Sequence, residues 1–216
     1  MTDPAGMATP NNSGEARGAI SKLEAIAATF GPGERITVGE LFARMEERAY
    51  GLLLLILALP CCLPFVYILP QIVALPMLLL AGQLAMGRTS PWLPKKLAQR
   101  SFEADTLQQV IARARPWLRF AEWFAYPRLA FLTDGFALRI IGALLLIPTA
   151  SILVPLPLTN SVPGIGVAIV AIGLIERDGL LVIGGMILGL GWVAALIIGG
   201  QAAIALLMDL VKGTIS

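Results

Sequence analysis

The 216-residue chain lacks histidine altogether and has few charges, since Asp, Glu, Lys and Arg make up only 14% of it. Soluble domains normally have about 25% charged residues. Hydrophobic residues reach 57%, and no charged side chain lies within the long apolar runs. General acid-base catalysis inside those runs therefore has no candidate residue. The composition predicts an integral membrane protein and disfavours an enzyme.

Two other absences exclude cofactor classes. The sequence has neither a Walker A loop nor a Gly-x-Gly-x-x-Gly motif, which removes the obvious nucleotide sites. Its only cysteines, Cys61 and Cys62, are neighbours in an apolar stretch. Adjacent cysteines are poorly placed for a mutual disulfide, and no histidine is present to complete a metal site. We expect both to pack against neighbours, and we expect no cofactor and no metal.

The first 48 residues contain five basic and seven acidic residues. This balance neither attracts nucleic acid nor resembles the basic flank of a cleavable leader, so neither is expected. Residues 1–14 are rich in Pro, Asn, Ser, Gly and Thr and are predicted to be a disordered tail. Residues 15–216 are predicted to form a single membrane domain.

Two uncharged blocks dominate that domain, residues 49–87 and 140–175, and prolines occur near the middle of both. The first block has 39 residues, whereas two full crossings need about 40 apolar residues plus a turn. Proline removes a backbone hydrogen bond that lipid cannot replace. We therefore predict an all-α fold with two Pro-broken helical hairpins, either re-entrant or fully spanning. The predicted arms of the first are 51–59 and 71–86, around breaks at Pro60, Pro64, Pro70 and Pro76, and the second breaks between Pro148 and Pro163.

A shift of 91 positions aligns the two blocks. The matched residues are Arg48 with Arg139, Gly51 with Gly142, Leu53 to Ile56 with Leu144 to Ile147, Pro64 with Pro155, and Gly82 with Gly173. Paired, broken hydrophobic segments are how membrane transporters place irregular backbone inside a bilayer. The pattern predicts an internal repeat, with 15–87 as its first copy and 139–176 as its second hairpin.

The linker between the hairpins, residues 88–138, is basic and aromatic. The stretch 88–139 contains nine basic and four acidic residues, so the hairpins are predicted to enter and leave on the cytoplasmic side. An inverted repeat is the alternative, but it requires this charged linker to cross the bilayer. Residues 179–209 are predicted to be a final transmembrane helix. Its Gly185-x-x-x-Gly189 allows close helix approach and favours a homodimer.

Amphipathic helices are expected outside the hairpins. Apolar spacing predicts one over 21–30 and another around 107–114. A third begins after Thr37, an expected N-cap with Glu40 three residues on as a capping box. It carries Leu41, Phe42 and Met45 on its apolar side. We expect these helices to lie at the membrane interface.

Several strings resemble a known family from about Thr37 onward. They are Leu57-Ala58-Leu59-Pro60 with Pro64, Gln83-Leu84, Gly87-Arg88, Pro91-Trp92-Leu93-Pro94, Pro127-Arg128, Asn160 with Pro163, and Gly173-Leu174-Ile175-Glu176-Arg177-Asp178-Gly179. Together they resemble the ExoD family of bacterial inner-membrane proteins, named for exopolysaccharide synthesis. The chain departs from the family at Glu46, where glycine is expected, and at Cys61-Cys62, where more polar residues are usual.

The candidate substrate-binding residues lie at the ends and breaks of the hairpins. They are Glu47, Arg48, Pro64, Gln83, Asn160, Pro163, Glu176, Arg177 and Asp178. Arg48 and Arg177 could donate paired hydrogen bonds to a lipid phosphate or a polyprenyl-linked sugar. The ordinary alternative is that these charges mark the membrane boundary and that Asp178-Gly179 is a helix-ending turn. The Asn160 amide either replaces lost backbone hydrogen bonds or contacts a passing polar group.

Two functional hypotheses follow, with membrane lipids as partners in both. The first is a non-enzymatic facilitator that moves or handles a lipid-linked saccharide or a small polar solute for envelope polysaccharide production. Proton-coupled pumping is disfavoured because the apolar runs contain no carboxylate. The second is a membrane scaffold that docks polysaccharide-assembly enzymes through residues 88–138. A membrane-embedded transferase is a third, weaker alternative.

Overall fold

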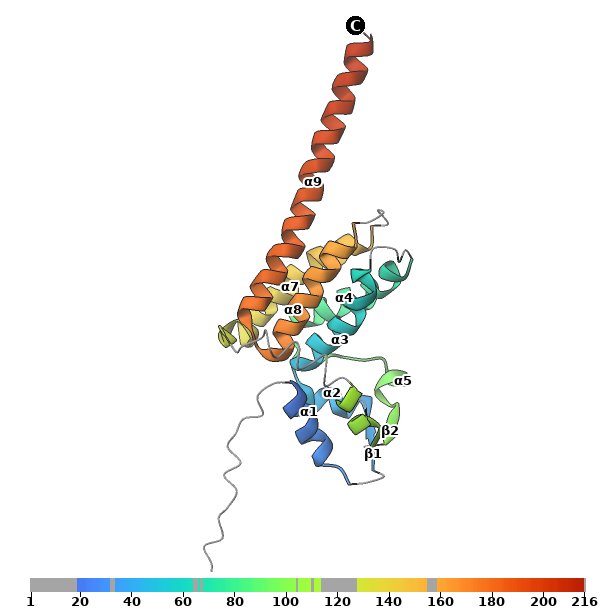
Figure 1. Ribbon diagram of the computed structural model, residues 1–216, viewed down its shortest axis with the longest axis vertical. Coiled ribbons are helices and arrows are strands. Elements are labelled where there is room, and N and C mark those ends of the chain that lie inside the picture. The colour runs from blue at the N-terminus through green and yellow to red at the C-terminus, as the bar shows by residue number, and fades with distance from the viewer. Residues whose placement is uncertain are drawn as a thin grey trace, which may run out of the picture.

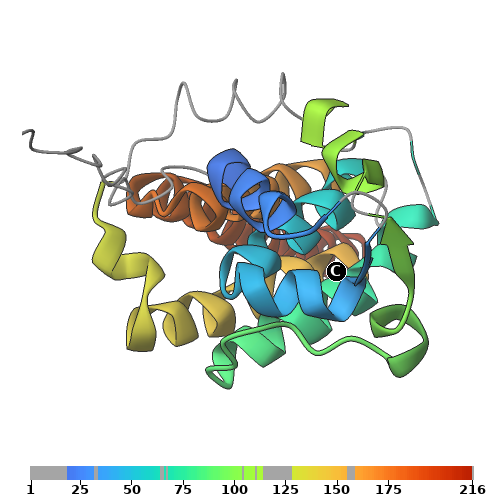
Figure 2. The same ribbon diagram turned by 90° about the horizontal axis from the view of Figure 1, so that it is seen from below.

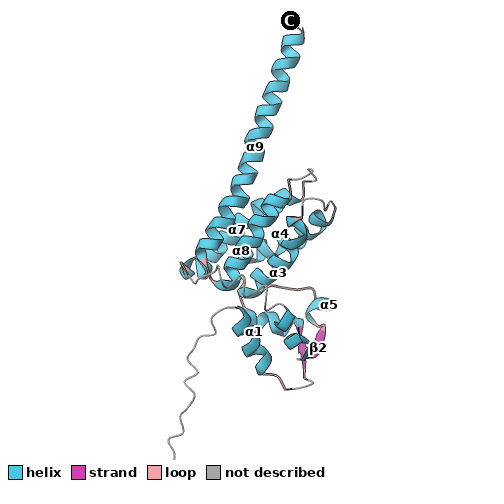
Figure 3. Ribbon diagram, viewed as in Figure 1, coloured by secondary structure: helices cyan, strands magenta, loops and turns pink. Residues whose placement is uncertain are grey.

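The structure of the protein is a computed structural model that describes residues 19–31, 34–63, 66, 68–103, 105–109, 111–113, 128–154 and 159–215. Two parts are visible in Figure 1, a small N-terminal module and a bundle of long helices from which the last helix projects. Almost all elements are helical, and Figure 3 shows the two short strands confined to the small module. The predicted tail at 1–14 lies outside the described residues.

The N-terminal module combines α1 (Ala19–Ala28), β1 (Arg35–Thr37), α2 (Val38–Met45), α5 (Lys95–Ala98) and β2 (Ser101–Glu103), together with helical residues 105–109 and 111–113. β1 and β2 pair antiparallel, with Ile36 opposite Phe102. This strand pair departs from the all-α expectation. The pairing connects the start of the chain to the linker between the hairpins.

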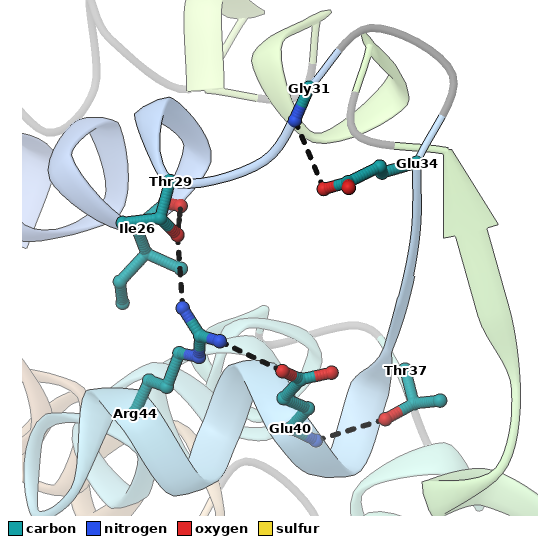
Figure 4. Close-up of polar contacts among 7 residues, drawn as sticks. All are labelled: Ile26, Thr29, Gly31, Glu34, Thr37, Glu40 and Arg44. Atoms are coloured by element: carbon teal, nitrogen blue, oxygen red, sulfur yellow. Dashed lines mark hydrogen bonds and ion pairs between the residues drawn. The ribbon is translucent and has the colours of Figure 1, made fainter.

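The capping prediction at Thr37 is confirmed in one direction, because the Glu40 amide donates to the Thr37 hydroxyl at 3.2 Å. The Glu40 carboxylate does not complete a capping box and instead accepts from Arg44 at 2.9 Å. Figure 4 shows that Arg44 also donates to Thr29, which joins the end of α1 to α2. The Arg44 guanidinium stacks 4.6 Å from the centre of the Phe30 ring.

The apolar sides of these helices form a core of their own. Leu41, Phe42 and Met45 of α2 are buried in a cluster that also contains Leu107 and Ile111. We expected these helices to lie at the membrane interface. Their apolar sides do not support that placement, because they pack against one another within the module. The physical reason is that β1–β2 pairing brings residues 105–113 over α2.

Two hairpins make the bundle. The first consists of α3 (Arg48–Ala58), the 3-10 turn η1 (Leu59–Cys62) and α4 (Leu69–Ala85). After η2 (Ala130–Thr133), the second consists of α7 (Gly135–Ile152) and α8 (Ser161–Glu176). Both hairpins turn at the same end of the bundle, which we call the tip, and both begin and end at the other, which we call the base (Figure 1).

The hairpins pack reciprocally, since α3 lies against α8 and α4 lies against α7. Glycines set both contacts. A Cβ on Gly51 would lie 2.7 Å from the Ala171 carbonyl oxygen, and a Cβ on Gly142 would lie 2.9 Å from the Ala81 carbonyl oxygen. Seen from below, the N-terminal module covers the base of the bundle (Figure 2).

The predicted breaks at Pro70 and Pro76 are wrong, whereas the second hairpin does turn between Pro148 and Pro163. Pro70 and Pro76 lie within α4, and Pro148 lies within α7. Pro70 stands in the first turn, where the missing N–H would have no helical partner in any case. Pro76 and Pro148 are interior, where each helix continues past the residue despite one absent hydrogen bond. The first turn begins with η1, and the second begins after α7 ends at Ile152.

The last helix, α9, runs from Gly179 to Ile215 and packs mainly on α8. Gly185 and Gly189 of its predicted close-approach motif face Gly166 of α8, where a Cβ would come within 2.9 Å of the Gly185 oxygen. This motif is therefore covered within the chain. Trp192 donates from its indole nitrogen to the Thr159 carbonyl at 3.1 Å and holds the second turn against α9.

Candidate functional site

The base of the bundle gathers charged residues from three segments into a charged mouth, formed by Glu47, Arg48, Asp134, Glu176, Arg177 and Asp178. Arg177 lies between two carboxylates, 3.4 Å from Asp134 and 3.9 Å from Glu47. Its charge and that of Glu176 both act on Arg48. The structure thus brings together the charged candidates that precede α3 and follow α8.

The local backbone explains how Arg177 reaches this position. It is the C-cap of α8, with a left-handed φ of 56°, and its amide donates to the Gly173 carbonyl. This conformation ends α8 and turns the chain toward α9. The Arg177 side chain can then reach the residues that precede α3 and α7. One arginine links three segments of the base.

Glu47 has a perturbed carboxyl in this mouth. Burial raises its pKa above the ordinary value, the neighbouring Asp134 adds to that effect, and Arg177 opposes it. The ion pair at 3.9 Å is therefore too weak to offset the lost hydration.

Asp178 and Glu176 are buried, with 2% and 8% of their surfaces exposed. The Asp178 carboxylate accepts from the amides of Leu180 at 2.9 Å and Leu181 at 3.3 Å. It is therefore the N-cap of α9. This contact favours the alternative that Asp178 has a structural role in the turn between α8 and α9 and does not bind substrate.

Gln83 is also engaged in structure. Its amide donates to the Trp92 carbonyl and accepts from the Trp92 N–H, which fixes the linker against α4. Tyr50 supports the same segment by donating to the Ser90 carbonyl at 3.0 Å. A substrate would have to break two hydrogen bonds to reach the Gln83 amide.

The tip contains the second group of candidates. Asn160 precedes α8 without capping it, and its Oδ1 atom is buried with no hydrogen-bond partner among the residues described. Oε1 of Gln71, near the start of α4, is likewise buried with no hydrogen-bond partner among the residues described. Pro163 is buried beside Gly164, which packs on Cys61. Pro64 lies outside the described residues.

Sequence reasoning missed two residues of these sites. Asp134 went unnoticed because its role depends on Arg177, 43 positions away, which no local pattern reports. Gln71 was read as the start of a helical arm. A polar amide between prolines in an uncharged run was the available signal, as it was for Asn160.

The described part of the chain is mostly helical, and two of its helices, Gly135–Ile152 and Gly179–Gln201, are long and apolar enough to cross a membrane. Residues 20–198 match the family model described as "Exopolysaccharide synthesis, ExoD". The chain belongs to the ExoD family.

Two relatives illustrate the match. The chain is 30% identical to Protein ExoD of Rhizobium meliloti over 158 residues, 71% of this chain and 65% of that protein. It thus covers less than two thirds of the Rhizobium protein. An uncharacterized protein of Synechocystis is 31% identical over 159 residues, 72% of this chain and 74% of that protein. No solved structure matches the chain.

Proposed function

We propose that this protein is a multi-pass protein of the bacterial inner membrane that handles a lipid-linked saccharide or a small polar solute during exopolysaccharide synthesis, without catalysing a covalent reaction. Membership of the ExoD family supports the link to polysaccharide, and the name of the Rhizobium relative is consistent with it.

Membrane embedding is supported by where the large apolar side chains lie. Ile72, Leu75 and Leu79 recur at helical spacing on α4 and are exposed. Exposed apolar side chains also occur on α3, α7 and α9. An apolar outer surface of this extent is unfavourable in water and favourable in lipid. We infer that the whole bundle lies in the membrane, with the charged mouth at one surface.

We also infer that the hairpins form a parallel internal repeat. The 91-residue shift maps α3 onto α7 and α4 onto α8, so the α3–α8 contact maps onto the α7–α4 contact. Gly51 and Gly142 are partners under the same shift, and each allows one of these contacts. The reciprocal packing favours a two-fold axis along the membrane normal, with both hairpins entering from the base.

The hairpin arms are short for full crossings. The 17 residues of α4 and the 16 of α8 correspond to about 25 Å of helix, against about 30 Å of hydrocarbon. The tip then lies within the membrane or at its far edge. This placement supports either a re-entrant hairpin or a full crossing through a locally thinned bilayer.

The observation that carries the proposal is the pair of unpartnered oxygens at that tip. Buried polar atoms are nearly always hydrogen-bonded, so an exception calls for an explanation. Asn160 Oδ1 and Gln71 Oε1 are both acceptors, suited to the hydroxyl groups of a sugar or to a solute N–H donor. We infer that these amides contact the polar part of the substrate.

Transfer of a fluorescent polyprenyl-phosphate sugar analogue between the leaflets of reconstituted vesicles tests the proposal. Wild-type protein is expected to accelerate transfer, and Asn160→Leu or Gln71→Leu to lower the rate about tenfold, the effect of about 1.4 kcal/mol. Ser151→Ala is the matched control, because the Ser151 hydroxyl bonds within its own helix, to the Pro148 carbonyl. Wild-type protein that transfers nothing but retains polysaccharide enzymes through residues 88–138 would favour the scaffold.

A further inference from the structure

A cleft at the base, which adjoins the charged mouth and shares Glu47 with it, contains two arginines. It has a volume of about 330 Å³ and lies between the end of α4 and the start of α7. We call it the arginine cleft. Arg88, Thr89 and Arg139 supply its polar lining, and Glu47 forms part of its rim. Both arginines and Thr89 are exposed.

The backbone holds Arg139 in place over the cleft. Gly87 ends the α4 turn with a φ of 77°, and the Arg139 guanidinium lies directly against its α-carbon, where a Cβ would overlap it. Arg88 follows immediately and donates its amide to the Gln83 carbonyl at 3.2 Å. The two guanidinium-bearing residues are thus attached to neighbouring, fixed segments.

The arginines have no carboxylate partner in the described parts of the chain. The ion pairs found there join Lys22 to Glu46, Arg44 to Glu40, and Arg177 to Glu47 and Asp134. Glu47, the one acid on the rim, faces Arg177 on its other side.

The internal shift of 91 positions explains why the two ends of the repeat differ. It places Ala85 on Glu176 and Gly87 on Asp178, while Arg139 corresponds to Arg48. The charged mouth therefore has two carboxylates where the arginine cleft has an alanine and a glycine. The arginines of the charged mouth are thus balanced by neighbouring carboxylates, whereas Arg88 and Arg139 of the arginine cleft are available to an external anion.

The surroundings indicate what carries that anion. Phe136 lines the cleft and is 74% exposed, and Met86 at the end of α4 is 70% exposed. The exposed apolar side chains of α4 lie next to them. Together they suit a ligand with a charged head group and an apolar chain. Arginine forks bind phosphate oxygens in pairs.

We propose that the arginine cleft binds the phosphate group of a lipid, with Arg88 and Arg139 as its ligands and the apolar chain lying along Phe136 and α4. This inference rests on the proposed function and names the group by which the substrate is held at the base. The phosphate then binds in the arginine cleft and not in the charged mouth, where Arg177 already pairs with two carboxylates.

Native mass spectrometry of the full chain in a neutral detergent measures the binding. The probes are geranylgeranyl phosphate, geranylgeraniol, which has the same chain without phosphate, and inorganic phosphate. We expect only the first to bind tightly. Arg88→Gln and Arg139→Gln should each weaken it about tenfold, because each removes a charge-assisted contact. Arg139→Lys should recover part of the affinity, since it keeps the charge without the fork.

The matched control is the double variant Arg35→Gln/Arg100→Gln, which removes the same charge as Arg88→Gln/Arg139→Gln from exposed positions in the N-terminal module. It should change the affinity less than twofold. Equal weakening by both double variants would overturn the site, as would equal binding of geranylgeraniol. Equal binding of inorganic phosphate would overturn the lipid assignment.

A second substitution blocks the cleft while keeping both arginines. Gly87→Asp places a carboxylate beside Arg139 and displaces its guanidinium, which a Cβ at this position would overlap; aspartate tolerates a positive φ better than most residues. It should abolish binding of geranylgeranyl phosphate while the helix content is kept. Undiminished binding would overturn the inference. If binding were undiminished but transfer of the sugar lipid still depended on Asn160, only the arginine cleft would be refuted and the proposed function would stand.

Discussion

Glu46 adopts a backbone conformation that suits glycine. Its φ is 54° and its ψ is −128°, a region in which a Cβ is strained. The resemblance to the ExoD family led us to expect glycine here. Glu46→Gly should therefore stabilise the protein by about 1 kcal/mol, measured by denaturant unfolding in detergent.

The control at this position is Glu46→Ala. Both variants lose the exposed Lys22 ion pair, which contributes little, but alanine keeps the strain. Alanine should consequently be equal to wild type or slightly less stable. A glycine variant no more stable than the alanine variant would show that the conformation is not strained.

Glu47 gives a pH-dependent prediction. Its folded pKa is raised above the ordinary value of 4.5, chiefly by burial and then by Asp134. For an acid with a raised folded pKa, the unfolded state releases its proton first, so stability falls as pH rises through the window above 4.5. Glu47→Gln removes this loss and should raise the melting temperature at pH 8 but not at pH 4. A difference that is the same at both pH values would contradict the assignment.

At the scale of elements, glycine decides how closely α4 and α7 approach. A Cβ on Gly142 would overlap the backbone of Ala85, whereas nothing lies within 4 Å of a Cβ on Gly82. Gly142→Ala should destabilise the bundle by about 1–3 kcal/mol. Gly82→Ala, in the neighbouring helix, should stabilise it by up to about 1 kcal/mol. Thermal unfolding in detergent compares the two, and equal effects would refute this packing.

The junction of α8 and α9 depends on one cap. Asp178→Ala leaves the amides of Leu180 and Leu181 without their acceptor and should cost about 1 kcal/mol. Asp178→Asn keeps a side-chain acceptor and should recover most of the loss in the same unfolding measurement. If Asn and Ala were equally destabilising, the charge of Asp178 rather than its cap would be the stabilising feature.

The elements also show what local sequence can predict. The hairpin arms and the Thr37 cap followed from runs of apolar residues and one N-cap pattern. Pro76 was misread as a break, because tertiary packing on both sides of a helix outweighs one lost hydrogen bond. The β1–β2 pair was not predicted, since its strands are three residues long and lie 63 residues apart.

At the scale of the molecule, the parallel arrangement predicts that both turns have the same accessibility. Leu63→Cys and Val154→Cys, in a Cys61→Ala/Cys62→Ala background, report on the two turns, and Ser90→Cys reports on the base. A membrane-impermeant maleimide should treat the two turn positions alike and position 90 differently. Opposite labelling at 63 and 154 would mean that the repeat is inverted.

The contacts within the candidate site were less predictable than its members. Most of the charged residues could be named from the sequence because they lie at the ends of apolar runs. Their roles could not, since Arg177 and Glu47 are 130 positions apart and their contact depends on how the hairpins pack. The placement of Gly87 against Arg139, where an acid would pair with the guanidinium, likewise depends on how the hairpins pack.

The length of α9 has a mechanical consequence. From Gly179 to Met208 it is uncharged, about 45 Å of helix, whereas a bilayer offers about 30 Å of hydrocarbon. In a membrane the helix has to lean to cover its apolar length, and it leans further where the lipid is thin. Because the hairpins are attached to α9 through α8 and the Trp192–Thr159 hydrogen bond, they follow that inclination. Local bilayer thickness then sets the angle at which the charged end meets the lipid headgroups.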